Sequence, residues 1–361
     1  MRFGLFNLSP ARRSEASVPA IIHGVLDQVR LAEALGFDIA WFAEHHFANL
    51  SVSPSPLMAA AWCGAKTERI RVGPGVVVLP LYQPMRLVEE IAYADILTEG
   101  RLVLGVGSGS HHHEFRGFAL DVGTAHARFE EAMDILEMAF EQGEVAYAGK
   151  HFQVPPTTLS LRPIQRPSPP IYVAGLAKDA GVTRRIAERG YTPFASAQWL
   201  PTQAVVATRK LYEAGYAAAG HDPATMPYAI QRLVFLTDSK REALAVAEQA
   251  RYTYRVVTAL KAGTGRFDGC FVDEAPQAGE QTVEEILANA MIGDAERVAA
   301  MLAQDIEQVR PSHISLFIQF GDLSSARVLR SLETFGRTVV PLLERRFGPL
   351  EDLSPAALAA V

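Results

Sequence analysis

Short apolar runs alternate with amphipathic stretches along most of the chain. Residues 2–8 have the pattern of a buried strand, and residues 20–35 repeat apolar positions at helical spacing up to Gly36, a helix stop signal. This strand-then-helix order is unbroken for four cycles, loosens over residues 111–168 and then resumes. Eight strands are predicted, and they begin at Arg2, Phe37, Ile70, Arg101, Pro170, Tyr191, Tyr228 and His313.

These predicted strands are apolar on both faces, which is typical of a parallel sheet buried between layers. Eight strand–helix units predict an α/β fold, a (β/α)8 TIM barrel with insertions after strands 4 and 7. A doubly wound open sheet is the alternative. No break in composition divides the chain, so we expect one domain over residues 1–348, followed by a tail, 349–361, that frays.

Some elements are predicted outside the regular alternation. Within the loosened stretch we expect a helix over residues 126–142 and a small hairpin over 145–154. The Gly-rich segment 262–281 shows no periodicity, and the last helix is expected over 324–346.

The charge balance excludes several classes of protein. The 361 residues carry 34 Lys and Arg against 40 Asp and Glu, a net charge of −6. Such a chain lacks the basic footprint of a nucleic-acid-binding protein, and no block of like charge indicates a membrane-surface helix. The longest uncharged run, residues 72–85, contains three prolines and is shorter than the roughly 20 residues of a membrane span. We therefore expect neither a nucleic acid nor a membrane as partner.

Cysteine usage suggests a reducing compartment. Cys63 and Cys270 lie far apart in the sequence, and neither is part of a CxxC motif, so a disulfide framework and a structural zinc site are both disfavoured. The apolar stretch at the N-terminus is too short for a secretory signal. The expected location is cytoplasmic.

In a TIM barrel the active site lies at the C-terminal ends of the strands, where strand two is followed by His45 and His46. Adjacent residues of an extended segment point to opposite sides, so one of the two histidines faces the barrel mouth. This geometry disfavours a metal-dependent hydrolase, which needs two ligands aimed at one point, and we expect no metal. The ordinary interpretation is one core and one surface histidine, but the position at a strand end favours a functional one.

Glycines mark the ends of strands three and four. Gly73 and Gly75 inside strand three imply a bulge or a ligand that approaches the backbone closely. The GVGSGS run after strand four lacks the last glycine of a dinucleotide fingerprint, since Ser110 stands there, and the next predicted helix begins only near residue 126. Backbone exposed beside a flat ligand fits this run better. The HHHE segment that follows, 111–114, is either a metal-binding group or, more commonly, a solvated polar loop.

The loop after strand five has small residues just before a helix. Gly175, Leu176, Ala177 and Lys178 precede a helix start, where free N–H groups favour an anion such as phosphate. The alternative is an ordinary helix start capped by Asp179.

Several of these segments together resemble a known family, the bacterial luciferase-like monooxygenases. They include MRFGLF, FDIAWFAEHHF, IRVGPGVVVLP, QPMRLVEEIAYADILTEGRLVLGVGSG, PPIYVAG, AMIGDAERVAAML and FGRTVVPLLERRF. SVSPSP and AMIG also look like the branch that oxidises limonene and related terpenes, ketones or olefins. The resemblance covers nearly the whole chain.

The resemblance implies roles for particular residues. The family's active-site histidine, which supports formation and use of a flavin C4a-hydroperoxide, falls on His45, and its non-proline cis peptide falls on Gly75–Val76. The phosphate of FMN is expected at residues 175–178 and at Arg128. Gly107 and Ser108 are also expected at the flavin, but luciferases have Cys and Arg there, so light emission with a long-chain aldehyde is not expected.

The implied activity is an FMNH2- and O2-dependent monooxygenation of a small hydrophobic carbonyl, olefin or terpene-like substrate. A separate flavin reductase would supply FMNH2, because the chain has no nicotinamide fingerprint of its own. The substrate would lie beside His45 under a lid formed by residues 262–281. The other residues expected at the substrate are Phe6, Leu8, His46 and Trp199.

The resemblance also suggests a homodimer through the second and third helices, where Met58, Trp62 and Tyr93 supply apolar surface. Two other functions stay open. One is an oxidoreductase of the same superfamily that uses the deazaflavin F420, and the other is a flavin-binding protein without turnover.

Overall fold

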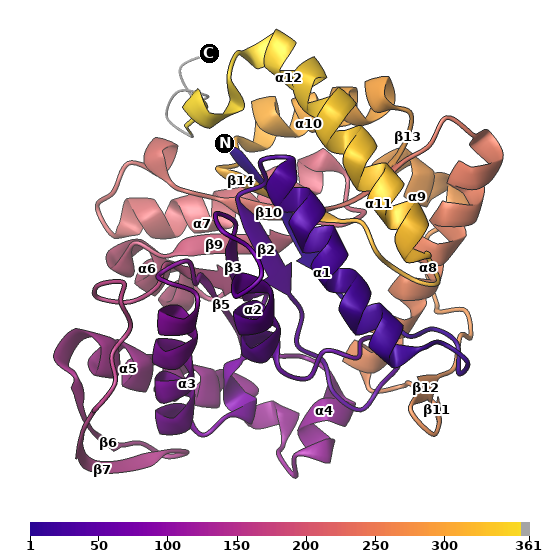
Figure 1. Cartoon of the computed structure of the whole chain (residues 1–361). Helices are drawn as coiled ribbons and strands as arrows, with labels where there is room; N and C mark the ends of the chain where they lie inside the picture. Colours follow the sequence, from indigo (N-terminus) through magenta and orange to yellow (C-terminus); the bar gives the residue numbers. More distant parts are fainter. Residues whose placement is uncertain (355–361) are drawn as a thin grey trace.

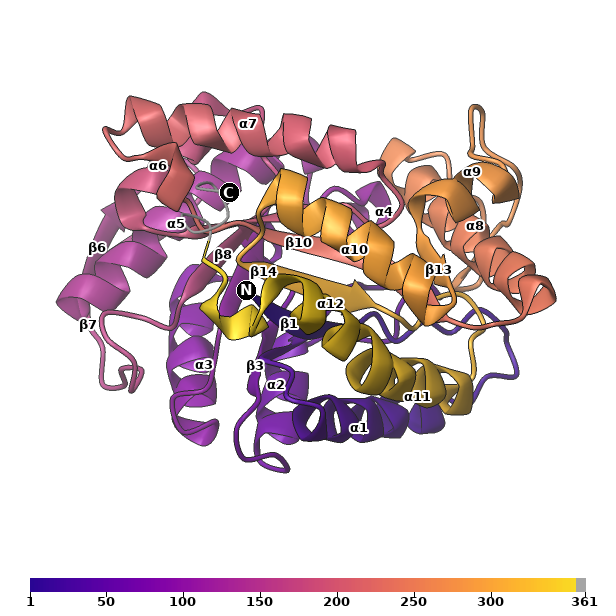
Figure 2. The same ribbon diagram turned by 90° about the horizontal axis from the view of Figure 1, so that it is seen from above.

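Eight parallel strands form a closed ring with helices on its outside (Figures 1 and 2). The computed structural model describes residues 1–354 of the chain. Each predicted strand is present and begins within three residues of its predicted start, so the TIM barrel is confirmed and the open sheet is not. The ring strands are β1 (Arg2–Asn7), β2 (Ile39–Phe42), β3 (Arg71–Pro74) continued by β4 (Val77–Val78), β5 (Leu104–Gly107), β8 (Ile171–Ala174), β9 (Thr192–Ser196), β10 (Ala229–Leu236) and β14 (His313–Phe317).

The ring closes at the third strand, which is divided into β3 and β4. β3 pairs with β2, β4 pairs with β5, and the amide of Val103 donates to the carbonyl of Val72 at 3.0 Å. Glycine is required where the backbones meet: a Cβ on Gly73 would lie 1.9 Å from the carbonyl oxygen of Val103, and one on Gly105 would lie 2.3 Å from that of Pro74. These glycines therefore allow two strands of the barrel to approach each other closely, whereas the sequence predicted a bulge, a strained peptide or an approaching ligand for Gly73 and Gly75.

The outer layer follows the strands in order. In both views α1 and α11 lie side by side, so the first and last parts of the chain complete the layer (Figures 1 and 2). The helices of this layer are α1 (Val18–Ala34), α2 (Pro56–Gly64), α3 (Pro84–Leu97), α5 (Ala125–Gln142), α6 (Ala180–Arg189), α7 (Thr202–Ala218), α8 (Lys240–Ala262), α10 (Ala295–Val309), α11 (Ser325–Thr334) and α12 (Val340–Phe347). The hairpin of β6 (Glu144–Ala148) and β7 (Gln153–Thr158) is also present as expected.

Other elements differ from the prediction. A short helix, α4 (His112–Gly117), forms in the loop after β5 where no helix is predicted. The Gly-rich segment contains a hairpin of β11 (Phe267–Asp268) and β12 (Phe271–Val272), and after α9 (Val283–Asn289) a further strand, β13 (Met291–Gly293), pairs with β10. These elements have only two to seven residues, too few for a periodic pattern to identify them.

The C-terminal helix is divided by a π turn. Residues Phe335–Val339 form this turn between α11 and α12, next to Pro341, which has no N–H to donate to the preceding helical turn. The tail does not simply fray, because Leu350 is buried and its carbonyl accepts a hydrogen bond of 2.7 Å from the amino group of Met1. Residues 355–361 lie outside the described part. Between residues 1 and 354, no helix has the length and apolar character that crossing a membrane requires.

A fully buried ion pair joins β10 to the helix layer. All eight residues of β10 are buried, and Arg232 among them donates to Asp305 of α10 through Nε at 2.6 Å and through a second nitrogen at 2.7 Å. Neither side chain is more than 1% exposed. This pair joins the seventh barrel strand to the helix that covers it.

Candidate active site

A cavity of about 400 Å³ opens at the C-terminal ends of the barrel strands. Because the strands are parallel, their last residues all lie at one rim of the barrel. This rim is the position expected for the active site of this fold. Nine of the residues predicted for the site line the cavity: Phe6, Leu8, His45, Gly75, Val76, Gly107, Ser108, Gly175 and Leu176.

The peptide bond between Gly75 and Val76 is cis, as the resemblance implied. It lies between β3 and β4, and the amide of Gly75 donates to the carbonyl of Phe42 on the neighbouring strand at 2.7 Å. Gly107 faces this segment so closely that a Cβ there would lie 2.9 Å from the Val76 side chain. Backbone therefore forms this part of the cavity wall.

His45 is held by a carboxylate. Its Nδ1 lies 2.9 Å from Oε1 of Glu114, a side chain that is 2% exposed and belongs to α4. The same oxygen accepts the backbone N–H of His46 at 3.1 Å. No residue within 1–354 forms a hydrogen bond with Nε2 of His45, so this nitrogen is free to act in the cavity.

Glu114 is ionised at neutral pH. Burial by itself raises the pKa of this carboxyl, but interactions with His111 and His45 outweigh burial and hold the pKa well below its ordinary range. An ionised carboxylate accepts hydrogen bonds and donates none, so Nδ1 of His45 is the donor in this contact. When the ring carries a single proton, that proton lies on Nδ1 and Nε2 carries the lone pair.

His46 does not line this cavity, which corrects its assignment to the substrate pocket. Its Nε2 lies 2.9 Å from Oε1 of the buried Glu44, and its ring packs edge-on against Phe118. Glu44 also accepts the backbone N–H of Val78 at 3.1 Å and the hydroxyl of Tyr82 at 3.0 Å. The two adjacent histidines thus turn to different sides, as alternation predicted, and His46 lines a second cavity of about 380 Å³.

Four further predicted residues also lie outside the lining. Arg128 donates from Nε to the carbonyl of Pro80 at 3.0 Å, and its guanidinium lies 4.6 Å from the centre of the Phe152 ring. Trp199 is buried, and its ring packs against the ring of Tyr254 with ring centres 5.5 Å apart. Ala177 and Lys178 continue the loop beyond Leu176 toward α6, which Asp179 caps by accepting the amide of Val182 at 2.9 Å.

The sequence reasoning missed a polar group on the far wall. Gln231 of β10 accepts a hydrogen bond of 2.8 Å from Gln198 and one of 3.3 Å from Ser196, and all three residues line the cavity. The available signal was a pair of polar residues, Gln231 and Arg232, inside an otherwise apolar strand. Lys261, exposed at the end of α8, also lines the cavity and forms no ion pair within the described residues.

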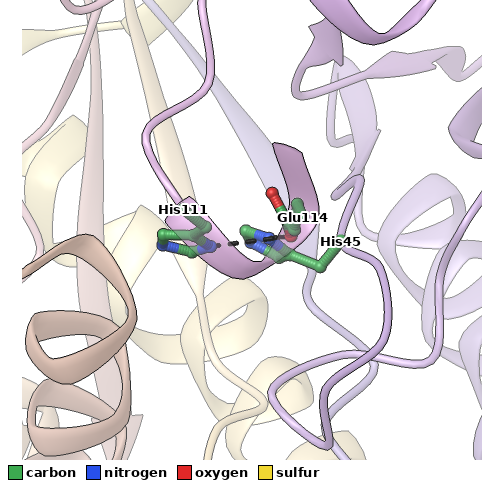
Figure 3. A group of neighbouring side chains, drawn as sticks. All are labelled: His45, His111 and Glu114. Carbon is green, nitrogen blue, oxygen red and sulfur yellow. Dashed lines mark hydrogen bonds and ion pairs between the residues drawn. The ribbon is translucent and has the colours of Figure 1, made fainter. Parts of the chain in front are cut away.

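The histidine run after β5 is not a solvated loop. His111 is 4% exposed and lines the cavity, and its Nδ1 lies 3.6 Å from the Glu114 oxygen that also contacts His45 (Figure 3). The rings of His45 and His111 stack with centres 4.8 Å apart. Two histidines, His45 and His111, therefore lie next to one carboxylate, that of Glu114. They are not the adjacent pair His45 and His46.

Residues 1–313 match the profile of the luciferase-like monooxygenase family, so the chain belongs to this family. An uncharacterised protein, y4vJ, of Sinorhizobium fredii is 33% identical over 97% of this chain and all of its own length. The oxygenase component of the flavin-dependent trigonelline monooxygenase of Acinetobacter baylyi is 30% identical over 48% of this chain and 49% of its own. Limonene 1,2-monooxygenase of Rhodococcus erythropolis is 32% identical over 37% of this chain and 34% of its own.

Solved structures share the fold over almost the full length. Monooxygenase RslO1 of Streptomyces bottropensis has a TM-score of 0.82 at 23% identity and covers 95% of this chain and 99% of its own. The oxygenating constituent of 3,6-diketocamphane monooxygenase of Pseudomonas putida, in complex with FMN, has a TM-score of 0.76 at 20% identity, with 94% and 98% covered. An F420-dependent secondary alcohol dehydrogenase has a TM-score of 0.75 at 18% identity, with 95% and 98% covered.

Proposed function

We propose that this protein is the oxygenase of a two-component, FMN-dependent monooxygenase that acts on a small hydrophobic carbonyl, olefin or terpene-like substrate. The observation that carries the proposal is the placement of His45. Glu114 contacts Nδ1 at 2.9 Å, so that Nε2 is the ring nitrogen without a protein partner, within residues 1–354, at the wall of a cavity of about 400 Å³. A base in this position can take up and return a proton during oxygen transfer.

The cavity wall fits a flat cofactor. Gly75, Val76 and Gly107 expose backbone to the cavity, and the amides of Leu176, Ala177 and Lys178 have no hydrogen-bond acceptor within residues 1–354. Such free amides just ahead of a helix suit a phosphate group. FMN in its reduced form supplies the electrons that activate O2. Because Arg128 is engaged by Pro80 and Phe152, we assign the phosphate to the loop amides.

An apolar wall supports the proposed substrate class. Phe6 and Phe317 pack edge to face with ring centres 5.4 Å apart, and Leu8, Leu50 and Val257 complete this side of the cavity. Such a wall excludes water from the reacting groups and favours a hydrophobic molecule. We assign the role of a lid to the segment 262–281. Its hairpin is attached to Asn49, whose backbone N–H donates to the carbonyl of Cys270 at 2.8 Å and whose side-chain Oδ1 accepts the backbone N–H of Val272.

The cofactor is tested by titrating the protein, under anaerobic conditions, with reduced FMN, reduced riboflavin and reduced F420. We expect reduced FMN to bind at least about tenfold more tightly than either of the others, a difference of about 1.4 kcal/mol. Riboflavin differs from FMN only by the phosphate, so it is the matched control for the loop amides. Tighter binding of F420 would favour the dehydrogenase-like alternative, and FMN binding without substrate-dependent O2 consumption would favour a non-catalytic flavoprotein.

A homodimer is expected through α2 and α3. Met58 is 73% exposed and Tyr93 is 57% exposed on these neighbouring helices, whereas Trp62 is partly covered by His23. Sedimentation at micromolar concentration should give twice the chain mass of 39.3 kDa, and Met58→Glu together with Tyr93→Arg should give the monomer. A wild-type monomer under these conditions would refute the proposal.

A further inference from the structure

Three potential metal ligands converge at the rim of the active-site cavity. One ligand atom from each of His45, His111 and Glu114 lies within 4.8 Å of the other two, and the residues come from the segment after β2 and from α4 with its N-cap (Figure 3). The side chain of Glu114 is 2% exposed and that of His111 is 5% exposed. The side chain of His45 is 23% exposed, so two of the three residues are buried and the third is partly buried.

His111 is the residue that suggests a ligand. Its Nδ1 is buried and has no hydrogen-bond partner within residues 1–354, because the nearest acceptor, Oε1 of Glu114, is 3.6 Å away. A buried ring nitrogen without a partner is costly, so an occupant between the three atoms would stabilise it. Within residues 1–354, no hydrogen bond holds Nδ1 of His111 in its position 3.6 Å from Glu114.

The spacing suits a shared ion. A metal about 2.0–2.2 Å from each ligand atom holds neighbouring ligand atoms roughly 3–3.5 Å apart. The two distances from Glu114 Oε1, 2.9 Å to His45 and 3.6 Å to His111, bracket this range. The backbone N–H of His46 donates to the same oxygen at 3.1 Å and fixes its orientation, as outer-shell hydrogen bonds do in metal sites.

We propose that His45, His111 and Glu114 form a binding site for a divalent transition-metal ion of the Zn²⁺ class, with its open position toward the cavity. Two imidazole nitrogens and one carboxylate oxygen favour Zn²⁺ or Co²⁺ over Mg²⁺ and Ca²⁺, which prefer oxygen ligands. A catalytic type of zinc site likewise has three protein ligands and one open position.

Binding would change which nitrogen of His45 is available. In the metal-free protein Nδ1 of His45 contacts Glu114, and Nε2 has no protein partner within residues 1–354. An ion on Nδ1 uses the lone pair of that nitrogen, so the ring proton lies on Nε2, which then donates a hydrogen bond instead of accepting one. An occupied site would therefore remove the base that the proposed monooxygenation uses, and only this consequence rests on the proposed function.

The test uses the full-length protein after treatment with a chelator and desalting. Co²⁺ is added and its visible absorption is recorded, and Zn²⁺ affinity is then measured by competition with a chromophoric chelator. The variants are His111→Ala and Glu114→Gln. His112→Ala is the matched control, because His112 belongs to the same histidine run but is exposed and outside the cluster.

We expect one equivalent of Co²⁺ to give the absorption of a site with nitrogen ligands in the wild type and in His112→Ala, and Mg²⁺ not to compete. Affinity for Zn²⁺ should fall at least about 100-fold in His111→Ala and Glu114→Gln, since losing even an outer-shell partner costs about 10–100-fold. The proposal is overturned if the wild type shows no such band, which needs no variant to fold, or if His111→Ala and His112→Ala bind equally. Reduced-FMN binding is measured separately, so a failed metal site leaves the proposed function intact.

Discussion

Replacing His45 by alanine is expected to lower the rate of substrate oxygenation by about 10²–10⁴-fold, the usual effect of losing an acid–base partner. Nε2 of His45 is a ring nitrogen without a protein partner, within the described chain, at the cavity, and the opposite nitrogen of this ring is held by Glu114 at 2.9 Å, whereas Nδ1 of His111 lies 3.6 Å from the same oxygen. FMN binding should be retained, because we assign the phosphate to the loop amides of residues 176–178, and His45 is not part of that loop. Single-turnover mixing of the reduced, FMN-loaded protein with O2 and substrate measures the rate.

His46→Ala is the control for this prediction. His46 faces Glu44 and not the main cavity, so its loss should cost less activity and should appear mainly as reduced thermal stability, because Glu44 is buried and loses a partner. If His46→Ala abolishes oxygenation while His45→Ala does not, the active histidine has been assigned wrongly. If neither substitution changes the rate, the histidine pair has a structural role.

The second large effect is expected at the buried ion pair between barrel and helix layer. Asp305→Ala should lower the free energy of unfolding by about 3–5 kcal/mol, since it leaves the charge of Arg232 buried without its carboxylate. Asp305 also accepts the hydroxyl of Thr202 at 2.7 Å, so the loss affects a small network. Denaturant unfolding followed by circular dichroism measures the change.

The matched control for this prediction lies on the same helix. Glu307 of α10 pairs with Arg346, but both side chains are about half exposed, and Glu307→Ala should cost no more than about 1 kcal/mol. Replacing both buried partners by apolar residues, Arg232→Met with Asp305→Leu, should recover most of the stability that Asp305→Ala loses. Equal effects of Asp305→Ala and Glu307→Ala would show that burial does not strengthen the pair.

Part of the candidate site could be predicted because strand periodicity and strand ends are local properties. The apolar run that ends at Ala43 marks β2 and places His45 just beyond its end, and the glycines of strands three and four include Gly75 and Gly107, which line the cavity. The partners of His45 could not be found this way. Glu114 lies 69 residues after His45 in the sequence, on a six-residue helix that is too short to show a periodic pattern. Only closure of the barrel brings β2 and the loop after β5 together at the rim.

The misplaced residues show the same limit. The side chains of His46, Arg128 and Trp199 are held by Glu44, by Pro80 with Phe152, and by Tyr254. The partners of Arg128 and Trp199 come from other parts of the chain, so a motif within one segment does not contain them, whereas Glu44 lies only two residues before His46. Neighbouring side chains therefore decided which of these residues reach the cavity.

The sequence by itself determined the barrel, the order of its strands and the family, because alternating apolar and amphipathic segments specify which backbone is buried between layers. It also determined that His45, Gly75, Val76, Gly107 and Gly175 stand at strand ends, where a parallel barrel forms its site. Tertiary structure alone decided that Glu114 and His111 meet His45, that His46 turns away, and that Arg232 finds Asp305. These contacts join residues far apart in the chain, and their geometry depends on how the closed ring brings loops and helices together.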